Sequence, residues 1–260
     1  MSKKINKILK KKNKNKIVCL TSYSKTVAQI LDKHCDIILV GDSMANVLYG
    51  MENTRSLSLN NIIQHGVSVK KGTNKSLLVI DMPKGSYKTP AQAKKNARLI
   101  FMKTKCDAVK IESNSKNFKI IQEIVKAKIP VMGHIGYTPQ FKKKFKVEGK
   151  DMKETRKLIK EAKSIENAGA FAIVLECITP KAAKLITNLL KIPTVGIGSS
   201  VNCDGQILVT DDILGLSGFY PKFLKKYAHL DRIIEKAVKK YSKEVKSKNF
   251  PKKTNYLYGK

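Results

Sequence analysis

The sequence predicts one α/β domain folded as a (β/α)8 barrel, and three observations support this fold class. Short apolar runs alternate with amphipathic segments about eight times along the chain, with short connections between them. Several runs are apolar throughout, as in parallel strands buried on both faces. The length, 260 residues, suits one barrel. A doubly wound open sheet is the alternative, but it would need a glycine-rich turn where residues 21–26 read TSYSKT.

In the first half of the chain, apolar patterns and boundary residues predict each element. Residues 37–40 read IILV, a continuous run typical of a buried strand. Thr89 and Pro90 form an N-cap and first-turn pair that opens a helix. Residues 43–55 contain Gly50 and are expected to be an irregular loop. The predicted strands are 17–21, 36–43, 76–82 and 107–112, and the predicted helices are 24–34, 58–71, 89–105 and 115–127.

The second half continues the alternation, and its last strand has the weakest pattern. Thr179 and Pro180 repeat the cap pair before another helix. The chain from Pro221 onward is expected to be helical, with a basic helix at 231–246 and an extended tail from 247. The predicted strands are 129–135, 170–177, 192–197 and 206–214, and the predicted helices are 151–168 and 179–190.

We expect a single domain over residues 1–260, with a basic N-terminal segment over 1–16 and a short C-terminal tail over 247–260. The chain is 42% hydrophobic, which is typical of a globular protein. No apolar run approaches the ~20 residues of a membrane helix, and no apolar signal core follows the basic N-terminus. We therefore expect a cytoplasmic protein with no membrane partner. The five cysteines form no CxxC pair, which favours reduced, mostly buried thiols.

The chain is strongly basic, with 52 Lys and Arg against 20 Asp and Glu and a formal net charge of +32. Such a balance can indicate nucleic-acid binding. Here the basic residues are spread along the whole chain, and no nucleic-acid-binding motif accompanies them. We favour a compositional bias with basic residues on solvated faces, and expect no dedicated nucleic-acid partner. A field of this sign would attract an anionic substrate.

Acidic residues end several of the predicted buried strands. Asp42, Asp81 and Glu112 close the second, third and fourth strands, and Glu176 closes the sixth. In a barrel these ends meet at the C-terminal face, where the fold places its chemistry. Converging carboxylates repel one another unless a cation lies between them, and oxygen ligands favour Mg²⁺. One acid alone could be a helix cap or a surface carboxylate, but the repetition favours a shared site.

The alternation of side chains along the strands adds three candidates. Lys110 lies two residues before Glu112, so both side chains are expected to point into the barrel. A buried lysine needs an anion, and a structural ion pair is the alternative to substrate binding. Glu176 is expected to point inward as a candidate general base, whereas Cys177 points the other way. His134 is either an auxiliary site residue or a hydrogen-bonded core residue.

The residues above fall within a series of longer motifs. Through these motifs the chain resembles the ketopantoate hydroxymethyltransferase family over residues 10–251. The motifs, in chain order, are LVGDS at 39–43, LVIDMP at 78–83, YKTPAQA at 87–93, VKIE at 109–112, GHIGYTPQ at 133–140, VLEC at 174–177, IPTVGIG at 192–198, DGQILV at 204–209 and YPKF at 220–223.

The resemblance implies a (β/α)8 barrel of the phosphoenolpyruvate/pyruvate-type superfamily, assembled as a homodecamer. It implies a one-carbon transferase that moves a hydroxymethyl group from 5,10-methylenetetrahydrofolate to 3-methyl-2-oxobutanoate. The product would be 2-dehydropantoate, made through a Mg²⁺-stabilised enolate in pantothenate and coenzyme A biosynthesis.

The same resemblance implies roles for individual residues. Asp42 and Asp81 resemble the metal ligands of the family, and Glu112 joins the metal site through water. Asp42 and Asp81, together with Ser43 and Lys110, resemble the contacts to the ketoacid. Glu176 resembles the proton acceptor of the family, and His134 is assigned as an auxiliary residue.

The chain departs from the family pattern in several loops. Residues 44–46 read MAN in place of a glycine-containing turn, and Lys84 replaces an aromatic residue. The loop 141–149 lacks the glycine pair of the family, and Asp211 stands where the family has histidine. These changes concern the folate side and loop closure more than the ketoacid chemistry.

Two other functions are alternatives. A Mg²⁺-dependent 2-oxo-acid lyase or mutase of the isocitrate lyase type would also use acids at strand ends, but those lyases carry a KKCGH-like loop that this chain lacks. A basic barrel that binds RNA would show salt-sensitive affinity. The acids at the strand ends would repel phosphate and argue against RNA binding.

Overall fold

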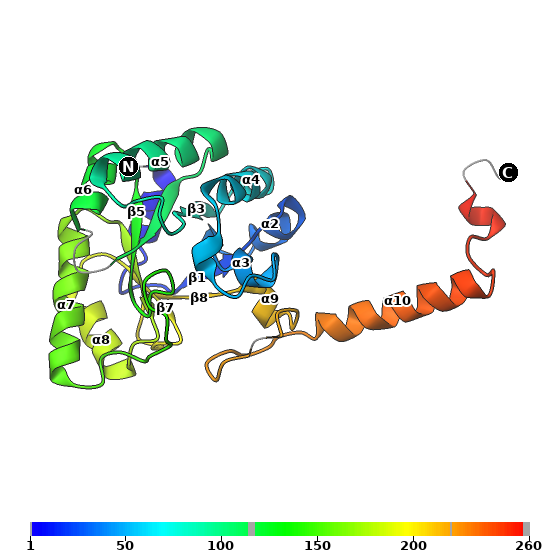
Figure 1. Cartoon of the computed structure of the whole chain (residues 1–260). Helices are drawn as coiled ribbons and strands as arrows, with labels where there is room; N and C mark the ends of the chain where they lie inside the picture. Colours follow the sequence, from blue (N-terminus) through cyan, green and yellow to red (C-terminus); the bar gives the residue numbers. More distant parts are fainter. Residues whose placement is uncertain (1, 114–117, 219, 257–260) are drawn as a thin grey trace. The chain divides into compact units, whose positions relative to one another are not determined.

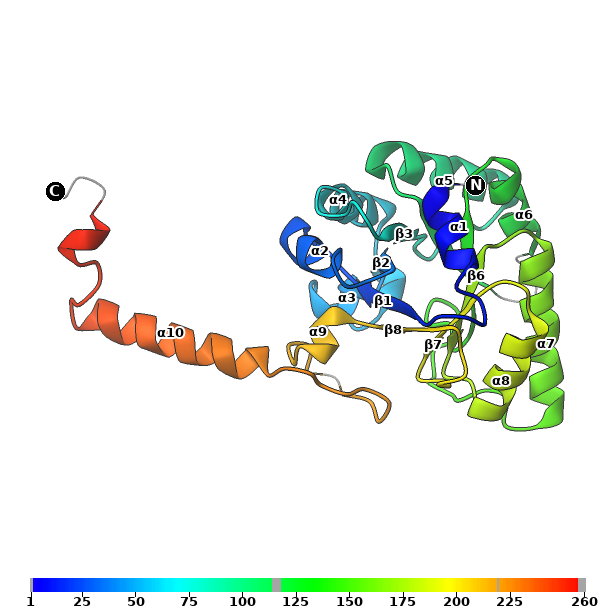
Figure 2. The same ribbon diagram turned by 180° about the vertical axis from the view of Figure 1, so that it is seen from behind.

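The computed structural model describes residues 2–113, 118–218 and 220–256, and the centre of this part of the chain is a closed barrel of parallel strands (Figures 1 and 2). The strands follow one another around the barrel in chain order, and β8 pairs with β1 to close it. This closure confirms the predicted barrel and excludes an open sheet. The strands are β1 Ile17–Thr21, β2 Ile37–Val40, β3 Leu77–Asp81, β4 Ala108–Glu112, β5 Val131–Gly136, β6 Ala172–Glu176, β7 Thr194–Ile197 and β8 Gly205–Leu208.

Helices lie between the successive strands from β1 to β7, as predicted, and pack around the barrel, whereas turns alone connect β7 to β8 (Figure 1). Ser24, Ser58 and Thr89 each accept a hydrogen bond from a first-turn amide, which stabilises the helix that follows. The start of the predicted helix 115–127 lies outside the described residues. The helices are α1 Lys3–Leu9, α2 Lys25–Leu31, α3 Met44–Val47, η1 Thr54–Ser56, α4 Leu59–Lys70, α5 Pro90–Thr104, α6 Phe118–Lys126, α7 Met152–Asn167, α8 Pro180–Leu189, α9 Thr210–Ile213, α10 Leu230–Lys246 and η2 Lys253–Asn255.

Side chains alternate along each strand between two apolar layers. In β4, Val109 and Ile111 belong to the layer between strands and helices, whereas Ala108 belongs to the barrel interior. Lys110 and Glu112 follow Ala108 at two-residue spacing. Their side chains therefore point into the barrel interior, toward the predicted site. The interior strand residues are Ile17, Cys19, Ile37, Leu39, Leu77, Val79, Ala108, Met132, Ala172, Val174, Val195 and Ile207.

Helix α1 contributes to this interior layer from the basic N-terminal segment. Ile5 and Ile8 of α1 are buried in the same cluster as the first residues of the strands. Lys12 forms a buried ion pair with Asp204, with Nζ 2.9 Å from Oδ2. The segment 1–16, predicted as partly helical, is therefore an integral part of the barrel core at the end opposite to the strand-end acids.

Several local predictions were wrong, mostly where short elements occur. Residues 43–55 contain α3 and η1 instead of an irregular loop, and residues 210–213 are helical instead of the end of the last strand. Residues 221–229 form turns and irregular structure, and the tail contains η2. Thr179 does not cap α8, because its hydroxyl donates to the carbonyl oxygen of Gly149 at 2.6 Å.

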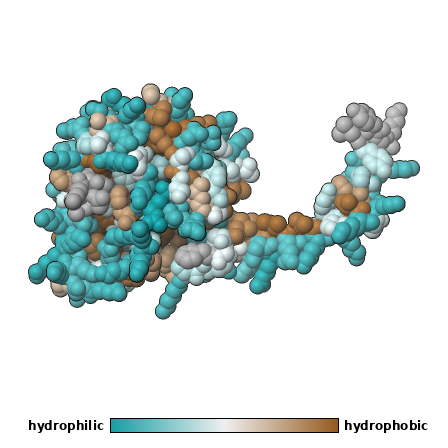
Figure 3. Space-filling view, in the orientation of Figure 1, coloured by the Kyte–Doolittle hydropathy of each residue, from teal (hydrophilic) through white to brown (hydrophobic). Residues whose placement is uncertain are grey.

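The chain divides into two compact units, Met1–Thr210 and Asp211–Lys260. In the second unit, α10 has no buried residue, and Figure 3 shows apolar residues gathered along one side of it. Among the described residues, no helix has both the length and the apolar character needed to cross a membrane. A single domain over 1–260 remains a prediction from the sequence.

Candidate active site

The predicted site residues come from the C-terminal ends of successive strands. Asp81, Glu112 and Glu176 are the last residues of β3, β4 and β6. The strand register places Asp81 beside Lys110. It also places Glu112 beside His134, and all of these residues keep the inward phase of their strands.

Asp42 reaches the site in a different way, because β2 ends before it. The phase of β2 directs Leu39 into the barrel, so a strand continued to Asp42 would turn its side chain outward. A turn after Val40 breaks this phase. The Asp42 amide donates to Asp81 Oδ2 at 3.0 Å, which ties this turn to the end of β3.

A buried ion pair joins β3 and β4 at the centre of the site. Lys110 Nζ lies 2.6 Å from Asp81 Oδ1. Asp81 and Lys110 are 2% and 5% exposed. The attraction between the two charges is therefore weakly screened by water. One ammonium faces three buried carboxyl groups, those of Asp42, Asp81 and Glu112, so the cluster carries an excess of negative charge when all three are ionised.

The loop after β5 contributes Gln140, which is fully buried. Pro139 is the second residue of a turn in which the Thr138 carbonyl accepts from the Phe141 amide at 2.9 Å, and this turn directs Gln140 inward. The Gln140 backbone amide donates to Glu112 Oε2 at 2.9 Å, and its side-chain Nε2 donates to Asp42 Oδ2 at 2.8 Å. Gln140 thus links the carboxylates that follow β2 and end β4.

His134 and Glu176 form the other side of the site. His134 Nε2 lies 3.1 Å from Glu176 Oε2, and His134 Nδ1 lies 3.8 Å from Glu112 Oε1. The Glu176 carbonyl accepts from the Tyr137 amide at 2.9 Å. Gly136, with φ of +92°, allows this approach, because a Cβ there would lie 2.1 Å from the same carbonyl oxygen.

Burial and mutual repulsion shift the pKa values of the acids. Burial raises the pKa of Asp42 to about 7, and the charge of Asp81 adds to the shift. Burial, followed by the charge of Asp42, raises the pKa of Glu112 well above its usual range. Burial also acts to lower the pKa of Lys110, but the charges of Asp81, Asp42 and Glu112 outweigh it and raise that pKa. Asp42 and Glu112 would lose their protons more readily beside a cation.

Burial and the charge of Lys110 lower the pKa of His134, which favours the neutral imidazole. A neutral imidazole carries a proton on one ring nitrogen only. With that proton on Nε2, the ring would present a donor to Glu176. The adjoining Cys177 is buried, and burial raises the pKa of its thiol to about 12, which removes it as a nucleophile at neutral pH.

The donor set fits a hydrated divalent cation. Asp42 and Asp81 lie side by side, joined by the hydrogen bond from the Asp42 amide to Asp81 Oδ2, and both are almost fully buried. No three His, Cys, Asp or Glu side chains in the described part of the chain are arranged to hold a metal ion. Asp42 and Asp81 could hold such an ion as a pair, with waters completing the shell, as Mg²⁺ prefers.

The structure brings together the residues that the sequence singled out, and it adds two more. Ser43 lies next to Asp42, and its hydroxyl is 2.8 Å from that of Tyr23. Sequence reasoning missed Gln140 and Tyr87, whose hydroxyl donates to Gln140 Oε1 at 2.5 Å. Both lie in quoted motifs, but an uncharged residue in a loop gives no sign of its burial.

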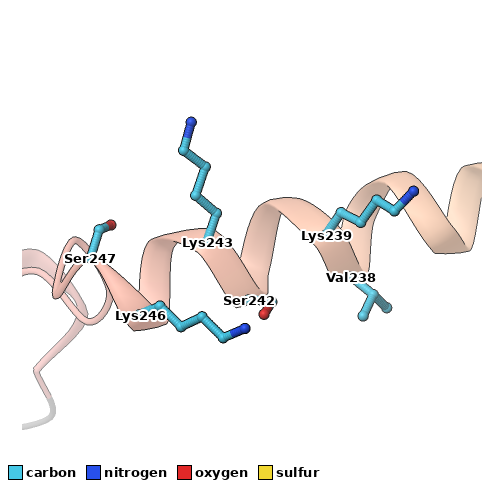
Figure 4. Close-up of a pocket in the computed structure, with 6 residues that line it drawn as sticks. All are labelled: Val238, Lys239, Ser242, Lys243, Lys246 and Ser247. Atoms are coloured by element: carbon cyan, nitrogen blue, oxygen red, sulfur yellow. The ribbon is translucent and has the colours of Figure 1, made fainter.

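Figure 4 shows a different place, a shallow hollow along α10. Three lysines, Lys239, Lys243 and Lys246, project around it. The other residues that line it are Val238, Ser242 and Ser247. This hollow lies on a single helix and the residue that follows it, and it has no carboxylate to assist a proton transfer. It is therefore no candidate for the catalytic site.

Solved structures with a similar backbone support the fold class. One is a phosphonopyruvate hydrolase complex with oxalate and Mg²⁺, which matches with a TM-score of 0.65 and 11% identity over 95% of this chain and 88% of that chain. Another is 2,3-dimethylmalate lyase, a member of the PEP mutase/isocitrate lyase superfamily, with a TM-score of 0.64 and 14% identity over 96% and 87% of the two chains. At this identity the likeness shows the fold, a (β/α)8 barrel like those of that superfamily.

Sequence comparisons are more specific. The family model of ketopantoate hydroxymethyltransferase matches residues 2–253. The 3-methyl-2-oxobutanoate hydroxymethyltransferase of Pelagibacter ubique is 47% identical over 97% of this chain and 98% of its own. The enzyme of the same name from Anaplasma marginale (strain St. Maries) is 48% identical over 93% and 88% of the two chains. The chain therefore belongs to the ketopantoate hydroxymethyltransferase family, which confirms the resemblance found in its motifs.

Proposed function

We propose that this chain transfers a hydroxymethyl group from 5,10-methylenetetrahydrofolate to 3-methyl-2-oxobutanoate, giving 2-dehydropantoate for pantothenate and coenzyme A synthesis. Family membership over nearly the whole chain supports the reaction and favours it over the lyase or mutase alternative. The observation that carries the proposal is the buried cluster of Asp42, Asp81, Lys110 and Glu112 at the strand ends.

Mg²⁺ is the proposed cofactor, with Asp42 and Asp81 as its protein ligands and Glu112 acting through water. Three buried carboxyl groups face one ammonium, and mutual repulsion contributes to the raised pKa of Asp42, so full ionisation of the cluster calls for a further cation at this place. When bound, the ion would polarise the ketone of the substrate as a Lewis acid. The choice of Mg²⁺ rests on oxygen ligands and on the need for retained waters.

The ketoacid is proposed to bind against Ser43, Lys110 and the two aspartates. The Lys110 ammonium offers a fixed positive charge inside the barrel, held in place by Asp81. It would pair with the substrate carboxylate and offset the negative charge that develops on the ketone oxygen. The Ser43 hydroxyl would donate a hydrogen bond to the same anion.

Glu176 is proposed as the proton acceptor. Its carboxylate is 18% exposed, so it is reachable from the site while the other acids are almost fully buried. It would remove the proton from the carbon next to the ketone, and the resulting enolate would attack the one-carbon unit. His134 Nε2, 3.1 Å away, would orient the carboxylate and accept no proton itself.

The protein is further proposed to act as a homodecamer. Support comes from α10, where Ile234, Val238, Tyr241 and Val245 form an apolar stripe at helical spacing and are 43% to 58% exposed. An exposed stripe of this kind is typical of an association surface. A cytoplasmic location and the absence of a dedicated nucleic-acid partner remain predictions from the sequence.

The direct test is product formation with purified protein. We expect 2-dehydropantoate from 3-methyl-2-oxobutanoate and 5,10-methylenetetrahydrofolate, loss of activity after treatment with EDTA, and recovery on adding Mg²⁺. Heat-treated protein and a reaction without folate are the controls. A folded protein that gives no product with both substrates and Mg²⁺ would contradict the proposal.

A further inference from the structure

Gln140 forms hydrogen bonds to residues at three strand ends inside the site. Its backbone amide donates to Glu112 Oε2 at 2.9 Å at the end of β4. Its side-chain Nε2 donates both to Asp42 Oδ2 at 2.8 Å, after β2, and to the Met82 carbonyl at 3.1 Å, after β3. Every polar group of this side chain is used, and the residue is fully buried. The contacts that fix Asp42 and Glu112 therefore meet in one residue.

The Tyr87 hydroxyl sets the orientation of this amide. It donates to Gln140 Oε1 at 2.5 Å, because a carbonyl oxygen can only accept. The two N–H groups of the amide must then face Asp42 and Met82. Turning the amide by half a rotation would place its oxygen against two acceptors and its N–H groups against a hydroxyl. One orientation is therefore strongly preferred.

Gln140 is uncharged, and this matters for cation binding as much as its position does. Two buried carboxylates that approach one another repel, and donors are needed to hold them in place. A second lysine would hold them but would also cancel the negative charge that attracts a cation. The amide supplies donors without adding charge, so the cluster keeps its capacity for a divalent ion while its geometry is fixed.

We infer that Gln140 is a positioning residue that presets Asp42 and Glu112 for the cation and the ketoacid, and that Tyr87 acts through it. The inference rests on the proposed function and deepens it. It explains why a neutral loop residue, and not a ligand or base, makes the hydrogen bonds that join the acids.

Cation binding by the whole protein is the first test. Gln140→Met keeps the length of the side chain and removes its donors to Asp42 and the Met82 carbonyl, whereas the backbone amide that donates to Glu112 is retained. Tyr87→Phe removes one hydroxyl. We expect Mg²⁺ affinity, measured by calorimetry without substrate, to fall about 10-fold or more in Gln140→Met, because hydrogen bonds to a charged group are lost. Tyr87→Phe should weaken it about 5-fold, as for a neutral bond. The double variant should be no worse than Gln140→Met.

Matched controls separate positioning from general destabilisation. Gln206→Met removes a glutamine whose Nε2 donates to the Ser200 carbonyl, away from the acids. Tyr49→Phe removes a hydroxyl that contacts His65. Both should leave Mg²⁺ affinity and the KM for 3-methyl-2-oxobutanoate within twofold of the parent protein. Gln140→Met should raise that KM and lower kcat, while its melting temperature stays well above the assay temperature.

Each outcome decides between the inference and the proposed function. The inference would be overturned if the Gln140→Met and Tyr87→Phe variants bound Mg²⁺ and the ketoacid as tightly as the parent protein does, even with the reaction intact. If Gln140→Met fails to fold, Tyr87→Phe alone decides. An inactive parent protein that binds Mg²⁺ would contradict the proposed reaction, and the affinities of the variants would still test Gln140. A parent that makes product without binding Mg²⁺ contradicts the metal site, and an unchanged KM in both variants would then overturn the inference.

Discussion

At the scale of the residue, Lys110 decides whether the acid cluster can exist in the folded protein. It is the cation paired with Asp81, and three buried carboxylates depend on its charge. Removing one partner of a buried pair leaves a charge without compensation, which costs far more than losing a surface pair.

We predict that Lys110→Met lowers the free energy of unfolding by roughly 3–5 kcal/mol at pH 8 in EDTA, because Asp81 is left buried without the cation that pairs with it. Urea denaturation followed by circular dichroism measures this loss. Lys126→Met is the matched control, since Lys126 pairs with Glu123 on the surface at 2.9 Å and should matter much less. Equal losses in the two variants would contradict the assigned role of Lys110.

The raised pKa of Asp42 predicts a pH dependence of stability. Between its ordinary value of 3.8 and the folded value of about 7, the folded state holds a proton that the unfolded state has released. The free energy of unfolding should therefore fall as pH rises through this window in EDTA. His134, whose pKa is lowered, acts in the opposite direction, so the comparison with Asp42→Asn isolates the effect. Identical pH slopes in the two proteins would show that Asp42 titrates normally.

The strand-end acids were predictable from the sequence, and the residue that links them was not. Asp81 and Glu112 end apolar runs, so their chain position and inward phase could be predicted. Asp42 was predicted at the strand end, although its inward position depends on a turn that breaks the strand phase. Gln140 depends on a turn made by Pro139 and on bonds to three distant segments, which no local pattern encodes.

At the scale of the element, long patterns predicted the fold and short ones failed. Buried strands and long helices bury enough apolar surface to fix their own identity, and their alternation was sufficient for the barrel. The four-residue helices α3 and α9 have no room for a periodic pattern. Thr179 has the sequence of a cap but bonds to Gly149, because tertiary contact overrides the local preference.

The packing of β5 against α7 gives a prediction at this scale. A Cβ on Gly133 would lie 2.5 Å from Ile165 Cγ2, so the strand and helix are in close contact. Gly133→Ala should lower the free energy of unfolding by about 1–3 kcal/mol through overpacking. In a double-mutant cycle measured in urea, adding Ile165→Ala should cost less than the sum of the separate changes. Strict additivity would mean that the two residues do not press on each other.

At the scale of the whole molecule, the apolar stripe of α10 predicts self-association. Light scattering with size-exclusion chromatography should give a mass well above the 29.1 kDa of one chain. Ile234→Gln with Val238→Gln should reduce that mass, because the exposed stripe loses its apolar character. Lys236→Gln with Lys240→Gln, on the same helix, is the matched control and should leave it unchanged. A mass that stays unchanged in the Ile234→Gln and Val238→Gln variant would contradict this role of α10.

The most direct measurement of the central claim is solvent deuterium exchange at C3 of 3-methyl-2-oxobutanoate, followed by NMR with and without Mg²⁺. We predict Mg²⁺-dependent exchange by the parent protein that is lost in Asp81→Ala. We also predict that Glu176→Gln abolishes exchange while ketoacid and Mg²⁺ still bind, because only the proton acceptor is removed. A folded parent protein that shows no exchange, in the presence or absence of folate, would contradict the claim that these strand-end residues form an enolising site.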